Sequence, residues 1–190
     1  MAANLKTIAK HRIVNGVDVT ALGETLDAVA AAPQLARFQF RNNNRWMGGS
    51  RNRSTVLGFY GAGREDDTRQ AAFVFDADEP AVLHGTDRGA NPVEYLLHAL
   101  AACMTTTMVY HAASRGIEIE ALESDIEGDI DIRGFTGLSP DVPKGYREIR
   151  ATFRAKTKAD PALLDSLVRM SPVFNSVAGS VPVIVMIETR

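Results

Sequence analysis

The longest apolar stretch of the chain, from Asn91 to Gly116, predicts a single long helix. Asn91 is a favoured N-cap, Pro92 suits the first helical position, and Glu94 completes a capping box. Arg115 places a cation in the last turn, and the following glycine is a typical stop. A helix of about 24 residues would be roughly 36 Å long.

The polarity of this helix indicates where it lies. Apart from His98 and His111, which titrate near neutrality, no charged residue interrupts the run from Tyr95 to Ser114. A helix that is apolar nearly all round is either a membrane span or the buried axis of a soluble domain. The three threonines at 105–107 and the polar flanking strands favour the buried axis.

Three segments before this helix alternate between apolar and polar residues and predict an antiparallel meander. They are residues 36–46, 54–60 and 68–76, and each carries its aromatic or β-branched residues on one parity. The glycine-rich connections at 47–50 and 61–63 are turn-like.

The segment 17–32 predicts a helix, because Leu22, Leu26 and Val29 recur at helical spacing before Pro33 ends it. We expect an amphipathic helix that docks on the core or on a partner subunit. The domain division that follows is an N-terminal helical extension over residues 1–33 and a main domain over residues 34–190.

Four more elements are expected after the long helix: strands at 117–132 and 146–158, a helix at 160–170, and a strand at 181–188. The first strand carries acidic residues on one parity, and the second carries basic residues on one parity. Antiparallel pairing of the two would form ion pairs on a solvated sheet face, which explains the acidic run better than a metal site does. The element order predicts a single α+β domain.

Composition excludes several classes of function. A chain of 190 residues with 45% hydrophobic and 23% charged residues is an ordinary single globular domain. A net charge of −2 gives no reason to expect a nucleic acid or an anionic membrane as a partner. A single cysteine excludes a disulfide framework and a cysteine-based zinc site, and we expect no metal and no cofactor. No secretory pattern opens the sequence, so we expect a cytoplasmic protein.

The lone cysteine, Cys103, lies in the middle of the predicted helix. A cysteine in an apolar helix is usually inert core, and a nucleophile is the other interpretation. At 100° per residue, His98 lies about 140° from Cys103 and is a poor base for it. His111, about 80° round and two turns further on, is little better.

Several short motifs together carry a family resemblance: Asn91-Pro92, Ala101-Ala102-Cys103, Arg115-Gly116-Ile117, Gly128-Asp129 and Ser171-Pro172-Val173. From about residue 36 to residue 188 the chain resembles the OsmC/Ohr family. The resemblance implies an α+β fold in which antiparallel β-sheets pack around a long buried central helix. It also implies an intertwined homodimer with active sites at the subunit interface.

The resemblance further implies a thiol peroxidase of oxidative stress defence that reduces organic hydroperoxides. Cys103 matches the attacking cysteine of the family. The arginine that stabilises the thiolate is best matched by Arg51, with Arg53 as the next choice. A solvated turn is the alternative interpretation of these two arginines.

Two positions depart from the family pattern. The family's resolving cysteine precedes a proline, and this chain has Ser171 there, so a Cys103 sulfenic acid would need an external thiol reductant. The peroxidases carry a glutamate directly after Asn-Pro, where this chain has Val93. Glu94 is shifted by one position and is interpreted mainly as a helix cap, with a supporting role in the site as the alternative.

Two hypotheses about function follow. The first is a one-cysteine peroxidase that acts on organic hydroperoxides through Cys103. The second is a non-catalytic homodimer that binds a small hydrophobic or electrophilic ligand at its interface.

Overall fold

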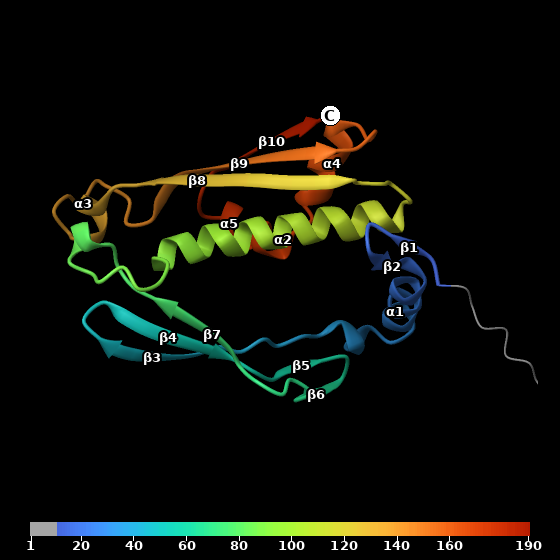
Figure 1. The fold of residues 1–190 in the computed structure, drawn as a ribbon, viewed down its shortest axis with the longest axis horizontal. Helices are drawn as coiled ribbons and strands as arrows, with labels where there is room; N and C mark the ends of the chain where they lie inside the picture. The colour runs from blue at the N-terminus through green and yellow to red at the C-terminus, as the bar shows by residue number, and fades with distance from the viewer. Residues whose placement is uncertain (1–10) are drawn as a thin grey trace, which may run out of the picture.

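The computed structural model describes residues 11–190. Its helices are α1 (Val19–Ala31), α2 (Pro92–Ser114), α3 (Ile132–Phe135), α4 (Pro161–Val168) and α5 (Pro172–Ala178). Its strands are β1 (Ile13–Val14), β2 (Val17–Asp18), β3 (Asn43–Gly48), β4 (Arg51–Val56), β5 (Phe59–Gly61), β6 (Arg64–Asp66), β7 (Phe73–Ala77), β8 (Ala121–Ile130), β9 (Tyr146–Lys156) and β10 (Val183–Thr189). Figure 1 shows β8, β9 and β10 alongside α2 in an upper layer, and β3 to β7 in a lower layer. The expected α+β fold is confirmed.

Helix α2 forms as the sequence predicts. The Asn91 side chain accepts a hydrogen bond from the backbone amide of Val93 at 2.9 Å, and the Glu94 carboxylate accepts one from the Asn91 amide at 2.8 Å. These bonds satisfy amides that the first helical turn leaves without partners. No helix in the described part of the chain is long and apolar enough to cross a membrane.

The upper layer holds the hydrophobic core. Leu100, Met104 and Met108 of α2 are fully buried in one cluster with Phe153 of β9 and Leu164 of α4. Strand β9 pairs antiparallel with β8 and parallel with β10, and its inward-facing side chains contribute most of the sheet's buried residues. The central helix is therefore buried on the side that faces this sheet.

The outer face of the upper sheet carries the predicted ion pairs. Arg150 on β9 lies 2.7 Å from Glu127 and 2.6 Å from Asp129, both on β8. Arg154 pairs with Asp125 in the same way. Because the carboxylates of these pairs are largely exposed, the pairs contribute little to stability, but they account for the charge pattern of the two strands. Among residues 11–190 no three His, Cys, Asp or Glu side chains are grouped to hold a metal ion.

The lower layer is thin and leaves large aromatic side chains uncovered. Strands β3, β4 and β7 pair antiparallel, and β5 and β6 form a separate hairpin. Phe40, Trp46 and Phe73 are 70%, 72% and 56% exposed. No helix or strand of the described chain covers these side chains, so the layer carries an open apolar surface.

The lower layer also differs from the predicted meander. The first strand was expected from residue 36, but β3 begins at Asn43, because residues 33–36 form a 3₁₀ turn and Gln39 makes only an isolated bridge to Tyr60. The second predicted strand is divided into β4 and β5. Alternating aromatic residues at 38–40 thus predicted a strand where the chain makes a single bridge.

The sequence did not predict the β1–β2 hairpin, strand β6, or helices α3 and α5. The hairpin turns at Asn15, whose φ is 52°, and the Asn15 side chain bonds to the backbone of Ile117 and Ile119 just after α2. These bonds attach the β1–β2 hairpin to the segment that follows α2. The first ten residues of the predicted N-terminal extension lie outside the described residues. Helix α1 confirms the predicted N-terminal helix.

Candidate functional site

Cys103 lies on α2 at the border between its buried and its open side, and it is half-buried. On one side of it Leu100 and Met104 are fully buried in the core. On the other side Ala102 and Thr106 are exposed. Cys103 is thus held by the core on one flank and remains accessible from the open side of the helix.

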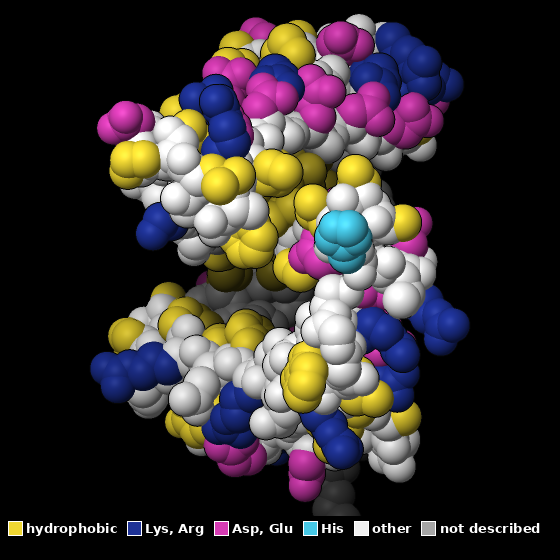
Figure 2. Space-filling view, turned by 90° about the vertical axis from the view of Figure 1, so that its left-hand side faces the viewer, with side chains coloured by type: hydrophobic (Ala, Val, Ile, Leu, Met, Phe, Trp, Pro, Cys, Tyr) yellow, Lys and Arg dark blue, Asp and Glu magenta, His cyan; other side chains and the backbone are white. Residues whose placement is uncertain are grey.

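A cavity of about 490 Å³ lies between the open side of α2 and the lower layer. Helix α2 contributes Tyr95, His98 and Ala99, and the lower layer contributes residues such as Ser54 and Phe75. Figure 2 shows the molecule hollowed between its two parts, with hydrophobic side chains around the hollow. Ala99, which lines the cavity, lies one helical turn before Cys103, and Cys103 itself is not a lining residue.

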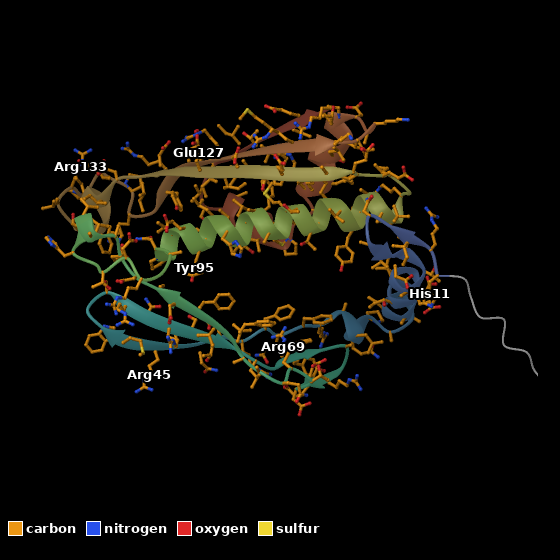
Figure 3. The ribbon with its side chains drawn as sticks, viewed as in Figure 1. His11, Arg45, Arg69, Tyr95, Glu127 and Arg133 are labelled. Atoms are coloured by element: carbon orange, nitrogen blue, oxygen red, sulfur yellow. The ribbon has the colours of Figure 1, made fainter. Side chains whose placement is uncertain are left out.

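Tyr95 connects the two layers at one end of the cavity. Its hydroxyl donates a hydrogen bond of 2.7 Å to the backbone oxygen of Asp76 on β7. Its ring meets Phe75 edge to face, with 6.2 Å between the centroids. Figure 3 shows Tyr95 between α2 and the lower layer, where it fixes the distance between them.

The structure places Arg51 and Arg53 on the other face of the lower layer. Asn52 and Ser54 line the cavity, and side chains alternate along a strand, so Arg51 and Arg53 project away from it. Arg53 also makes two hydrogen bonds to Asp76, at 2.6 and 2.8 Å, which lower the pKa of that carboxyl group. Within one chain neither arginine is therefore brought to Cys103.

Glu94 serves as a cap in this structure. Its carboxylate accepts the hydrogen bond from the Asn91 amide, as the capping box requires. Val93 stands at the position where the resemblance implied a glutamate, and it has no polar side chain. Its backbone oxygen accepts a 2.9 Å hydrogen bond from the Tyr146 hydroxyl. Burial, and secondarily the charge of Glu94, raise the pKa of Tyr146.

Ser171 is fully buried and begins α5. Its hydroxyl accepts a hydrogen bond of 3.2 Å from the backbone amide of Phe174. The serine at the family's resolving position thus has a structural role as an N-cap.

The sequence did not indicate Asp78, which with Ser171 is one of two buried polar or charged residues among residues 11–190. Asp78 is 1% exposed and accepts hydrogen bonds from the hydroxyls of Ser50 and Thr86, both at 2.5 Å, and from three backbone amides of residues 79–88. These bonds lower its pKa strongly. Asp78 directly follows Ala77, which lines the cavity, so it fixes the loop that connects β7 to α2. Asp78 precedes Glu79 and Pro80, and an aspartate at such a place is typical of an exposed turn. The sequence therefore did not indicate that its side chain is buried.

A family model for OsmC-like proteins matches residues 85–186, more than half of the chain. The chain belongs to the OsmC-like family. The matched region includes Cys103 and Ser171.

Solved structures with this fold come from several bacteria. An OsmC-like protein from Mycoplasma pneumoniae has 18% identity and a TM-score of 0.60, and the match covers 80% of this chain and 96% of that one. An organic hydroperoxide resistance protein from Elizabethkingia anophelis has 15% identity, a TM-score of 0.58, and coverage of 80% and 96%. An organic hydroperoxide resistance protein OsmC from Legionella pneumophila has 17% identity, a TM-score of 0.55, and coverage of 79% and 96%. At these identities the likeness shows the fold. Comparison with curated proteins found no match.

Proposed function

We propose that this OsmC-like protein is a one-cysteine thiol peroxidase that reduces organic hydroperoxides through Cys103 and an external thiol. The observation that carries the proposal is the position of Cys103, which is half-buried one helical turn after Ala99, a residue that lines the cavity. Two structures with this fold are named organic hydroperoxide resistance proteins, which supports the same reaction class.

The proposed reaction begins with the Cys103 thiolate, the nucleophilic form of the side chain. Its sulfur attacks the terminal oxygen of the hydroperoxide, the S–O bond forms and the O–O bond breaks. The leaving alkoxide takes a proton and departs as the alcohol, and the cysteine becomes a sulfenic acid. The apolar cavity would hold the organic part of the hydroperoxide during this step.

The second half of the reaction needs an external reductant. Ser171 cannot form a disulfide, and its hydroxyl is occupied as the cap of α5. A small thiol would therefore condense with the sulfenic acid, release water and leave a mixed disulfide. A second thiol would then attack that disulfide, which restores the Cys103 thiol and releases the oxidised reductant.

We also propose that the protein works as a homodimer. The lower layer exposes Phe38, Phe40, Trp46 and Phe73 by more than half each. An apolar surface of this kind on a sheet without a covering layer marks an interface. A second copy that covers it would complete the packing of both chains and close the open side of α2.

A non-catalytic ligand-binding dimer is the second candidate. It is favoured by the placement of Arg51 and Arg53, which leaves Cys103 without either cation in one chain, and by the use of Glu94 and Ser171 as caps. In this case the cavity would bind a small hydrophobic or electrophilic molecule without turnover.

One experiment separates the two candidates. The protein is treated with one equivalent of cumene hydroperoxide, with and without a dimedone-type trap, and analysed by intact-protein mass spectrometry. The peroxidase predicts a trapped sulfenic acid within minutes in the wild type and none in Cys103→Ala. If the wild type remains unmodified under these conditions, the peroxidase is excluded and the ligand-binding dimer remains.

A further inference from the structure

A second cavity, of about 420 Å³, lies in the upper layer where α2 ends and β8 begins. One wall comes from residues 116–120, between α2 and β8, and the other from residues 157–159, between β9 and α4. Figure 1 shows these elements at the right-hand end of the upper layer, opposite α3. The described lining contains no residue of the lower layer, so this cavity is separate from the surface that we assign to a second copy.

Hydrogen bonds hold both walls of this cavity in place. The Thr157 hydroxyl donates a bond of 2.6 Å to the backbone oxygen of Glu118, which joins one wall to the other. At the end of α2 the Ile117 amide donates a bond of 2.9 Å to the backbone oxygen of Ala112, directly after Gly116, whose φ is 71°. A left-handed glycine followed by such a bond ends a helix in a defined geometry. The walls are therefore fixed without a ligand.

The polar side chains of the cavity carry both signs of charge. Glu118, Glu120 and Lys158 line it. Glu120 is paired with Lys156, at 2.6 Å between the carboxylate oxygen and Nζ. Among residues 11–190, Glu118 and Lys158 form no ion pair at 4.0 Å or less, either with each other or with another residue. One carboxylate and one ammonium on facing walls are thus available to a ligand.

The rest of the lining is mostly apolar. Ile117 and Ala159 are partly buried and pack against the hydrophobic core. Leu163, in the first turn of α4, is 38% exposed and lines the cavity with them. Concave sites for small molecules combine apolar walls with a few polar groups that fix the orientation of the ligand.

We propose that this cavity binds an α-amino acid with an apolar side chain, in its zwitterionic form. The ammonium of the ligand donates to the Glu118 carboxylate, its carboxylate accepts from the Lys158 ammonium, and its side chain packs on Leu163. Both contacts are charge-assisted hydrogen bonds, which are stronger than neutral ones. A ligand with a single charge would pair only one of the two protein groups, whereas a zwitterion pairs both.

This site is distinct from the region of Cys103. Gly116, at the near edge of the cavity, lies roughly 20 Å from Cys103 along α2, at 1.5 Å per residue. The inference therefore does not depend on the chemistry that we propose for the cysteine. Cys103→Ala should bind the amino acid as the wild type does.

The test compares three ligands by titration calorimetry: leucine, N-acetyl-leucine, which lacks the ammonium, and leucinamide, which lacks the carboxylate. We expect the wild type to bind leucine about tenfold more tightly than either derivative. Glu118→Gln should lose only the preference over N-acetyl-leucine, and Lys158→Gln only the preference over leucinamide. The matched controls are Glu24→Gln on α1 and Lys144→Gln before β9, which change exposed residues and should keep both preferences.

The proposal is overturned if the wild type binds none of the three ligands, if it binds them equally, or if the two controls lose the preferences as fully as Glu118→Gln and Lys158→Gln do. The comparison of ligands on the wild type requires no variant, so it decides the question even if a substitution prevents folding. Alanine should bind less tightly than leucine, because it has less apolar surface to bury. Equal affinities for alanine and leucine would overturn the assignment of the apolar side chain to Leu163.

Discussion

The carboxylate of Asp78 accepts a hydrogen bond from the hydroxyl of Ser50 at 2.5 Å, although 28 residues separate them in sequence. This bond connects the end of β7 to the turn between β3 and β4. A second bond of 2.5 Å from Thr86 connects the same carboxylate to the loop that precedes α2. One buried side chain therefore sets the position of the lower layer relative to the start of the central helix.

We expect Asp78→Ala to destabilise the protein far more than a surface substitution does. The change would leave two hydroxyls and three backbone amides without their acceptor in a buried place, and each unpaired donor carries a desolvation cost. The melting temperature should fall by at least several degrees. The control is Asp67→Ala, which removes an exposed aspartate of the same layer and should leave the melting temperature unchanged.

The same carboxylate predicts how stability depends on pH. Hydrogen bonds hold the folded-state pKa of Asp78 well below its ordinary value of 3.8. A carboxyl group with a lowered folded-state pKa stabilises the protein above its unfolded-state pKa, and this contribution is lost as the pH falls. Urea unfolding should therefore show stability falling steadily below about pH 4 in the wild type and falling less in Asp78→Asn. Equal slopes in the two proteins would contradict this account.

Sequence periodicity predicted the central helix and the β8–β9 pair of the upper layer, although not α3 or α5, and it was insufficient for the lower layer. The capping box of α2 and the acid–base pairing of β8 with β9 depend on local or neighbouring residues, and both were predicted. The aromatic alternation at Phe38 and Phe40 predicted a strand, but these side chains form a cluster outside the named strands of the sheet. Their packing depends on contacts that the pattern within one segment does not specify.

The candidate site was predicted in part for a similar reason. Cys103 is half-buried one helical turn after Ala99, which lines the cavity, and its role stays a prediction. Arg51 was chosen as the best match to the arginine of the OsmC/Ohr family, and strand parity could have shown that Arg51 and Arg53 lie on the other face of the strand from Asn52.

Ser171→Ala tests whether this serine is a cap or part of the reaction. Loss of an N-cap hydroxyl typically costs about 1 kcal/mol, so the variant should be less stable by about that amount in urea unfolding. Formation of the Cys103 sulfenic acid should continue at the wild-type rate, because the hydroxyl is bound to the Phe174 amide. Ser176→Ala, which changes an exposed serine inside α5, is the control for stability. A Ser171→Ala protein with wild-type stability and slow sulfenic acid formation would show a direct role.

Dimerisation predicts that the stability of the protein depends on its concentration. If the lower layer is covered only by a second copy, unfolding and dissociation should occur together, and each tenfold increase in concentration should stabilise the folded dimer by about 1.4 kcal/mol. Phe40→Gln, which changes a side chain that is 70% exposed in one chain, should favour the monomer and lower the unfolding midpoint. Met186→Gln is the control, because Met186 is exposed on the upper sheet, beside Thr152. Light scattering and urea unfolding at three concentrations measure both effects. A wild type that is monomeric at every concentration, with a constant midpoint, would mean that the aromatic side chains of the lower layer remain exposed to solvent.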